Sequence, residues 1–339
     1  MRIVGRSIVC AWLVVAAAAP WVAPYAPSRQ FPDAAFAPPT RVHVWRAGAP
    51  AAPFIHRFAL IDPLTRTIAT DTSSVVPLVW FSGGHVLTAA DPSAPFLLLG
   101  ADKLGRDLFS RIVYGARLSL TVACSSLLIA VLLGTLGGLI AGYAGGVTDQ
   151  ALMRLAEFTI VLPVLYAVLA LRAAMPLHLP TTETVVLMAL VFALVSWPTT
   201  ARGVREIVAA ERTLDYVAAA EALGAGPLRI MLRHLAPAAA GFIATQSLLL
   251  LPMLIVAEAT LSFAGLGLQD DAPGWGTLLQ EAANLGALGA APWLLAPAAA
   301  LFSLVLGVNL SFERSSLGLA VDTPLSLVRR DPAGDAARV

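Results

Sequence analysis

Long apolar stretches alternate with short polar ones along most of this chain. A helix crosses a bilayer with about twenty mostly apolar residues. The pattern predicts six transmembrane helices, so both chain ends would fall on the same side of the membrane. The expected spans are residues 8–26, 118–148, 157–174, 184–201, 238–262 and 292–312. The predicted fold class is an all-α membrane protein.

One long segment interrupts this pattern. Between the first two expected spans the chain carries scattered charges, many prolines and no long apolar run. We therefore divide the chain into an N-terminal transmembrane anchor at 1–27, a water-exposed insert at 28–117, a five-helix core at 118–313 and a tail at 314–339.

The insert contains two candidate strands. Residues 54–61 and 75–81 have the character of strands, and the second run ends in Ser82-Gly-Gly84, which is typical of a turn. Pro77 lacks an N–H group and therefore predicts that its strand lies at a sheet edge. We expect a small β-rich appendage.

Four glycines in the second expected span recur every four residues, and so lie on one helical face: Gly134, Gly138, Gly142 and Gly146. Small residues at this spacing let two transmembrane backbones approach closely. We favour close packing over a gating role.

Basic residues orient the spans. They precede the first span, fill the loop between the fourth and fifth, and follow the sixth: Arg2, Arg6, Arg202, Arg205, Arg212, Arg229, Arg233, Arg314, Arg329, Arg330 and Arg338. The loop between the fifth and sixth spans has Asp270, Asp271 and Glu281 but no Arg or Lys. Cytoplasmic loops are enriched in Lys and Arg. We expect both termini and the loop at 202–237 inside, and the insert outside.

The end of the insert predicts a surface helix. Apolar residues at 104, 108, 109, 112 and 113 suit an amphipathic helix lying along the outer membrane surface. Asp102 would cap this helix, and Arg106 and Asp107 would tie its start to neighbouring loops. This outer interfacial segment, with Gly105, Arg106, Asp107 and Arg111, is expected to brace the outer end of the helices without binding a ligand directly.

Composition supports lipid as the solvent. Apolar residues make up 58% of the chain and charged residues 13%, against about 25% charged in soluble domains, and the mean hydropathy is +0.78. The net charge of +1 gives no argument for nucleic-acid binding. Cys10 and Cys124 lie inside apolar stretches and the five histidines are dispersed, so we expect no disulfide framework and no metal site. Ser7-Ile8-Val9 before Cys10 favours a retained anchor over a lipoprotein signal.

Motifs of catalysis are missing from the sequence. It has no G-x-x-x-x-G-K-[ST] phosphate loop and no His-Glu-x-x-His pattern. We therefore expect no catalytic residue, and ATP-driven work would need an ATPase on another chain. A secondary transporter would favour internal repeats and midplane ion-binding residues, which this sequence does not show.

A few charges lie in or near lipid, where they are costly. Glu258, near the outer end of the fifth span, either lines the pathway or bonds neighbouring backbone, and the sequence leaves both open. Arg154 and Glu157 stand three apart, which favours a structural ion pair over a substrate site. Arg172 is expected to reach the interface with its long side chain.

The loop at 202–237 is organised. Thr213 can cap a short helix that places Tyr216, Ala219, Ala220 and Leu223 on one stripe. Asp215, Ala218 and Glu221 lie toward another face of this helix. Gly224 then ends the helix, and Pro227 suits the first turn of a second one. From the residues alone, the stripe either docks a partner or lies on the protein itself.

The run from Tyr216 to Gly224, Tyr-Val-Ala-Ala-Ala-Glu-Ala-Leu-Gly, followed by Arg233-His-Leu-Ala-Pro237, resembles the EAA loop of ABC-importer permeases. In that family the loop forms a coupling helix seated in a groove of a cytoplasmic ATPase. The resemblance implies that Asp215, Tyr216, Ala219, Ala220, Leu223, Gly224, Arg233 and Pro237 couple this chain to an ATPase. Ala218 stands where the family has its signature glutamate, which puts that salt bridge in doubt.

Two further segments are similar to the dipeptide, oligopeptide and nickel permeases, in the C-type subunit of the pair. They run from Leu99 to Leu120, with Ala101 where the family usually has Thr, and from Leu261 to Gly276. The resemblance implies a type I ABC importer permease fold in a bacterial inner membrane. It implies as partners a second homologous permease, two ATPases that hold ATP and Mg²⁺, an extracytoplasmic substrate-binding protein and lipid. The chain itself would need no cofactor, and its substrate stays open among peptides, nickel chelates and other small solutes.

Overall fold

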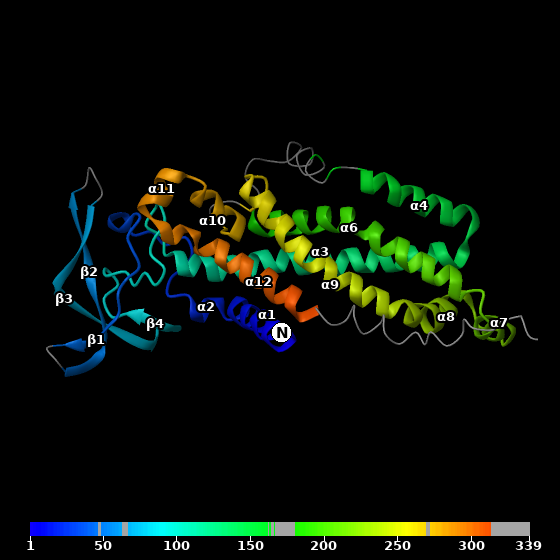
Figure 1. Cartoon of the computed structure of the whole chain (residues 1–339), viewed down its shortest axis with the longest axis horizontal. Helices are drawn as coiled ribbons and strands as arrows, with labels where there is room; N and C mark the ends of the chain where they lie inside the picture. The colour runs from blue at the N-terminus through cyan, green and yellow to red at the C-terminus, as the bar shows by residue number, and fades with distance from the viewer. Residues whose placement is uncertain are drawn as a thin grey trace, which may run out of the picture.

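The computed structural model describes residues 1–46, 49–62, 67–161, 163, 166, 180–268 and 272–312. A bundle of long helices carries a β-sheet at one end and two short helices at the other (Figure 1). The chain forms these elements: α1 Arg2–Ala17, α2 Ala19–Val22, η1 Pro32–Ala34, β1 His43–Arg46, β2 Ala49–Asp62, β3 Thr67–Ser82, β4 His85–Ala89, α3 Leu108–Ala144, α4 Gly146–Val161, α6 Thr181–Glu211, α7 Asp215–Ala222, α8 Pro227–Ile230, η2 Met231–Leu235, α9 Ala236–Phe263, α10 Trp275–Ala282, α11 Leu285–Ala290, η3 Pro292–Leu295 and α12 Ala296–Phe312.

Four helical stretches in the described part of the chain are long and apolar enough to cross a membrane: Leu108–Ala144, Thr181–Glu211, Pro227–Phe263 and Pro292–Ser311. They coincide with the second, fourth, fifth and sixth expected spans. The helix at Thr181–Glu211 runs ten residues past Ala201, so its last turns take up the start of the expected loop.

The first expected span differs from the sequence pattern, and only the start of the third lies among the described residues. The helix expected at 8–26 begins at Arg2 and ends at Ala17, and Pro20 then stands in the first turn of the separate helix α2. Proline has no N–H to continue a helical ladder, which explains the break. Helix α4 reaches only Val161. Most of the rest of the third expected span, including Arg172, lies outside the described residues, as do Asp270, Asp271 and the tail from 313.

Helices α3 and α6 run parallel in close contact, because glycine removes the side chain between them. A Cβ atom added at Gly134 would lie 2.6 Å from Thr200 Cβ, and one at Gly138 would lie 2.6 Å from the Ala201 carbonyl oxygen. One at Gly142 would lie 2.7 Å from Val208 Cβ. Close packing at these positions is confirmed. Gly146 differs, since it has a φ of +56° and nothing within 4 Å of an added Cβ; it begins α4.

Helix α1 packs antiparallel on α12. A Cβ at Gly5 would lie 2.6 Å from the Ser311 nitrogen, and one at Gly307 would meet Ile8. One to two turns further along α1, the Trp12 indole N–H donates to Ser303 Oγ at 2.9 Å. These contacts join the first helix of the chain to the last helix of the core.

The insert folds into an antiparallel four-stranded sheet in the order β1-β2-β3-β4. Both predicted strands are confirmed within β2 and β3, as is the Gly83-Gly84 turn, where both glycines have positive φ. The edge position predicted for Pro77 is wrong, because β3 has a neighbour on each side. Residues 67–77 of β3 pair with β2 and residues 78–82 with β4, so Pro77 stands at the point where the pairing changes partner.

The predicted outer surface helix is also wrong. Residues 108–117 form the first turns of α3, which continues without a break to Ala144. Asp107 caps this helix by accepting from the Ser110 N–H at 2.8 Å, while Asp102 binds arginine side chains instead of capping. The turn at 102–107 bends too tightly for a helix to begin at Asp102: Gly105 has a φ of +72°, and an added Cβ there would lie 2.0 Å from the Phe31 carbonyl oxygen.

Candidate functional site

The loop between α6 and α9 contains the first candidate site, and its turn follows the sequence prediction. Gly224 has a φ of +80°, its N–H donates to Glu221 O at 2.9 Å, and the Ala225 N–H donates to Ala220 O at 3.0 Å. This pair of bonds is the Schellman motif that a C-terminal glycine makes. Pro227 stands in the first turn of α8 as expected.

The predicted cap of α7 is wrong. Leu214 occupies the N-cap position, and no side chain caps the helix. Thr213 is engaged in the turn that directly follows α6, where its hydroxyl donates to Ala210 O at 2.8 Å.

One face of α7 anchors the helix to the bundle. Val217 is 1% exposed and packs in a cluster with residues of α3, α6, α8, η2 and α9: Leu139, Val204, Val208, Ile230, Leu235 and Ala239. Sequence reasoning missed Val217, although it is the only β-branched side chain among the alanines of this helix. The anchor fixes which face of α7 remains accessible.

The opposite surface of the loop is apolar and exposed. Leu223 is 89% exposed, and Leu214, Tyr216, Leu228 and Leu232 are exposed as well. The other residues assigned to coupling lie on the same loop: Asp215, Ala219, Gly224, Arg233 and Pro237 are exposed, and Ala220 is half-buried. We call residues 212–237 the coupling element. A concentration of exposed leucines in a polar loop is typical of an interaction surface.

Hydrogen bonds tether the coupling element to the ends of α3 and α6. The Arg212 guanidinium donates to Tyr143 O at 2.6 Å, and the Tyr143 hydroxyl lies 3.4 Å from a Glu221 carboxylate oxygen. The Tyr216 hydroxyl donates to Glu211 at 2.7 Å, and this bond to a carboxylate raises the pKa of Tyr216 to about 12. Motion of the coupling element would therefore be passed to both helices.

The coupling element ends in a π-helical turn that leads into α9. This turn covers Met231–Leu235, and the Ala236 N–H bonds to Met231 O five residues back. Pro237 follows at once and has no N–H to offer the Arg233 carbonyl, so regular α-helical bonding cannot continue through this point. Such turns occur frequently at functional sites.

The second candidate site is a buried group of four charges that we call the charge clamp: Asp102, Arg106, Arg111 and Glu281. Arg106 Nε lies 2.6 Å from Asp102 Oδ2 and its Nη2 lies 3.1 Å from Glu281 Oε1. Arg111 pairs with Asp102 and lies 2.9 Å from Glu281 Oε1. All four side chains are almost fully buried.

The charge clamp joins the turn before α3 to α3 itself and to α10. Among the residues that the structure describes, its two acids pair with its two bases, and buried charges are tolerated when they are paired. Burial raises the pKa of Glu281, and the neighbouring Arg111 opposes that shift. Arg106 and Arg111 were assigned to an outer segment from the sequence, but Glu281 was not, because it lies 170 residues from Arg111 along the chain.

Glu258 is fully buried in α9. One carboxylate oxygen accepts from Ser262 Oγ at 2.7 Å, and the other has no hydrogen-bond partner among the described atoms. Its observed bond is to a side chain and not to neighbouring backbone. Glu157 approaches Arg202 of α6 at 3.6 Å, so the pair predicted with Arg154 is replaced by a contact between helices.

Comparison with known proteins identifies relatives over most of the chain. Residues 134–316 match the family model described as binding-protein-dependent transport system inner membrane component. The chain is 32% identical to the di/tripeptide transport system permease protein DppC of Pseudomonas aeruginosa, over 86% of this chain and 78% of that protein. It is 34% identical to the dipeptide transport system permease protein DppC of Haemophilus influenzae, over 74% and 79%.

A relative with a different named substrate is the glutathione transport system permease protein GsiD of Pectobacterium atrosepticum, at 35% identity over 62% of this chain and 68% of that protein. The family match covers the coupling element, α9 and α12, and the longer alignments extend beyond it. The chain therefore belongs to the family of binding-protein-dependent transport system inner membrane components.

Proposed function

We propose that this chain is the C-type permease subunit of an ATP-driven importer for peptides or similar small solutes. The exposed leucine surface of the coupling element carries the proposal, because it is held in place by the buried Val217 and faces away from the bundle. The named peptide and glutathione permeases among the relatives support the substrate class.

In this proposal the chain crosses the membrane six times, with both termini in the cytoplasm. Helices α3 and α6 run in the same direction and end beside the coupling element, which carries Arg212, Arg229 and Arg233. The sheet lies at the opposite end of the bundle (Figure 1). Basic residues favour the cytoplasmic side, so the sheet and the charge clamp would be outside.

The partners follow from the same arrangement. Two ATPases would bind ATP with Mg²⁺ and seat the coupling elements of this chain and of a second permease. An extracytoplasmic binding protein would deliver substrate to the side of the insert. ATP would favour one of two conformations of the permease pair, and the tethers at Arg212 and Tyr143 would carry that bias into α3. The charge clamp would hold the outer end of α3 against α10.

Leu223→Arg tests the docking assignment. Because Leu223 is 89% exposed and touches no core cluster, the variant should fold and insert normally. A charge at the centre of an apolar interface should release the ATPases during copurification and abolish peptide uptake. Ala220→Arg should act in the same direction. The matched control is Val44→Arg, an exposed apolar residue of β1 at the other end of the molecule.

Normal copurification and normal uptake by Leu223→Arg would contradict docking at this surface. Loss of ATPase binding in Val44→Arg as well would show that both variants fail for a general reason. Val217→Ala separates the two roles of α7, since it should loosen the anchor and lower thermal stability of the permease while keeping the exposed surface intact.

A further inference from the structure

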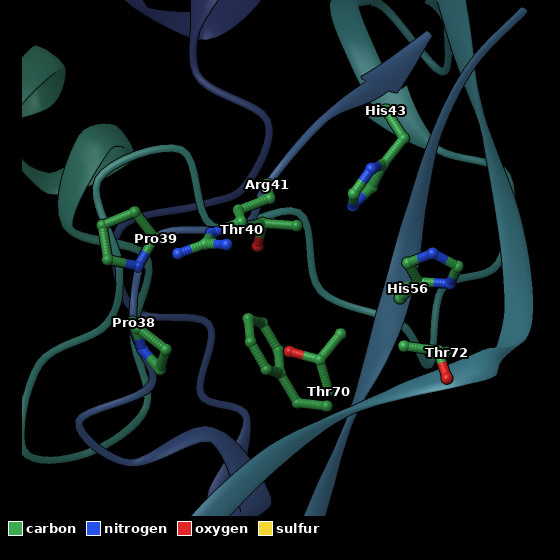
Figure 2. A pocket seen from close by; sticks show the side chains of 9 residues that line it. Pro38, Pro39, Thr40, Arg41, His43, His56, Thr70 and Thr72 are labelled. Carbon is green, nitrogen blue, oxygen red and sulfur yellow. The ribbon is translucent and has the colours of Figure 1, made fainter. Parts of the chain in front are cut away.

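A small pocket opens in the insert, far from the coupling element and separate from the charge clamp. Figure 2 shows Arg41, His43 and His56 around the hollow, with Pro38, Pro39, Thr40, Thr70 and Thr72. Its volume is about 340 Å³, and Phe58 completes the lining. The residues come from the segment before β1 and from strands β1, β2 and β3. No part of the proposed coupling function uses this pocket.

The two imidazole rings are held in place. His43 pairs with Phe54 across β1 and β2, and their rings stack at 5.4 Å. Phe54 also meets His56 edge-on at 5.4 Å, and the ring centres of the two histidines are 4.9 Å apart. His56 Nδ1 donates to the Ser74 carbonyl oxygen at 2.5 Å, since a carbonyl only accepts. This bond fixes the ring orientation and leaves Nε2 for a ligand.

The one permanent charge among the lining residues that the structure describes is the cation Arg41, and it favours an anion. Three threonine hydroxyls add hydrogen-bond groups, and no acidic side chain of the described residues lines the pocket. The nearby acids of the sheet are engaged elsewhere: Asp71 accepts from Ser73, and Asp91 pairs with Arg57.

We propose that this pocket binds a carboxylate group. Arg41 would hold it with the planar guanidinium fork that matches carboxylate geometry. His43 would donate a ring N–H from the other side, and the hydroxyls of Thr70 and Thr72 would add further donors. The inference rests on the proposed function only for the source of the carboxylate. That source would be the free C-terminus of a peptide or an acidic side chain of the binding protein.

The test uses the complete transporter in lipid nanodiscs, without binding protein, and isothermal titration calorimetry. Trialanine should bind. Trialanine with an amidated C-terminus should bind about tenfold more weakly or worse, because it has no carboxylate for Arg41. N-acetyl-glutamate amide, whose only carboxylate is that of the side chain, separates the two sources. If trialanine binds and this compound does not, the ligand is a peptide C-terminus. If both compounds bind, the site also accepts acidic side chains.

Arg41→Gln locates the site, because Arg41 is exposed and its replacement should leave the sheet folded. It should weaken trialanine binding about tenfold, and His43→Gln should weaken it as well. His85→Gln, a histidine of the same sheet outside the pocket, should bind as the wild type does. Equal binding of the acid and amide peptides, or no effect of Arg41→Gln, would overturn the proposal.

Zn²⁺ or Ni²⁺ binding that is lost in His43→Gln would replace a carboxylate by a metal ion as the ligand. Failure of these titrations leaves the docking test at Leu223 unaffected, since ATPase copurification does not depend on the insert.

Discussion

Buried charges at the start of α3 are the main result at the scale of single residues. The sequence from Asp102 to Arg111 reads as a solvated surface, yet Asp102, Asp107 and Arg111 are buried in the structure. Oδ2 of Asp107 accepts from the Ser110 N–H at 2.8 Å and from the Ser110 hydroxyl at 2.5 Å. Oδ1 of Asp107 has no hydrogen-bond partner among the described atoms. Burial raises the pKa of Asp107 to about 6, against the opposing bonds from Ser110.

This shift predicts a pH dependence. The folded state holds the Asp107 proton more tightly than the unfolded state, whose pKa is 3.8. The resulting stabilisation is complete below pH 3.8 and is lost as the pH rises through about 6. Asp107→Asn keeps a capping side chain but cannot titrate. Thermal unfolding in detergent between about pH 3 and 7, a range that spans both values, should show wild-type stability falling relative to the variant as the pH rises.

Asp149 is the control with the opposite sign. Its carboxylate is hydrogen-bonded by Arg205, which lowers the pKa of Asp149. Its stabilisation is therefore present above the ordinary value and lost as the pH falls, so Asp149→Asn should diverge from the wild type in the other direction. Parallel curves for wild type and Asp107→Asn would contradict the assigned shift.

At the scale of elements, the contact between α3 and α6 depends on missing side chains. A Cβ at Gly138 would lie 2.6 Å from the Ala201 carbonyl oxygen, a backbone atom that cannot move without its helix. The same glycine spacing ends at Gly146, where the chain turns into α4. The four-residue spacing of the glycines thus identified the face of α3 that packs on α6, and the turn into α4 ends that face before Gly146.

Gly138→Ala should force α3 and α6 apart and lower the free energy of unfolding by about 1–3 kcal/mol, the usual cost of overpacking. The matched control is Gly241→Ala in α9, where nothing lies within 4 Å of the added Cβ. That variant should be neutral or stabilised by up to about 1 kcal/mol through helix propensity. Fluorescence-detected thermal unfolding measures both, and equal effects of the two variants would rule out a steric role for Gly138.

For the whole molecule, the two candidate surfaces lie at opposite ends of one bundle (Figure 1). Helix α3 runs from the sheet end of the bundle to the coupling element, and α6 packs beside it in the same direction. If the bundle crosses a membrane, these ends face opposite compartments. This arrangement makes the orientation testable with two positions.

Single cysteines at Ala52 and Leu223 report the two sides, since both residues are exposed. Cys10 and Cys124 are exposed free cysteines and must first be replaced. In cells with a permeabilised outer membrane but an intact inner one, an impermeant maleimide should label Ala52→Cys, whereas Leu223→Cys should react only after lysis. Labelling in the reverse order would invert the orientation and remove the ATPase from the coupling element.

The sequence by itself determined the features that depend on neighbours along the chain. Apolar runs predicted four of the helices long enough to cross a membrane, alternation predicted strands β2 and β3, and Gly224 with Pro227 predicted the turn of the coupling element. These patterns succeed because hydrogen bonding within a helix or a tight turn involves residues only a few positions apart.

Only the tertiary structure decided the contacts between distant residues. Glu281 completes the charge clamp across 170 positions, Val217 becomes the anchor of α7 because α3 and α6 end beside it, and His43 meets His56 because β1 pairs with β2. Asp102 could cap a helix by its local sequence, but its Oδ1 accepts from the Leu104 and Arg106 N–H groups of a tight turn, and its Oδ2 pairs with the Arg106 and Arg111 side chains. Burial decides which charges must pair, and burial is a property of the packed chain.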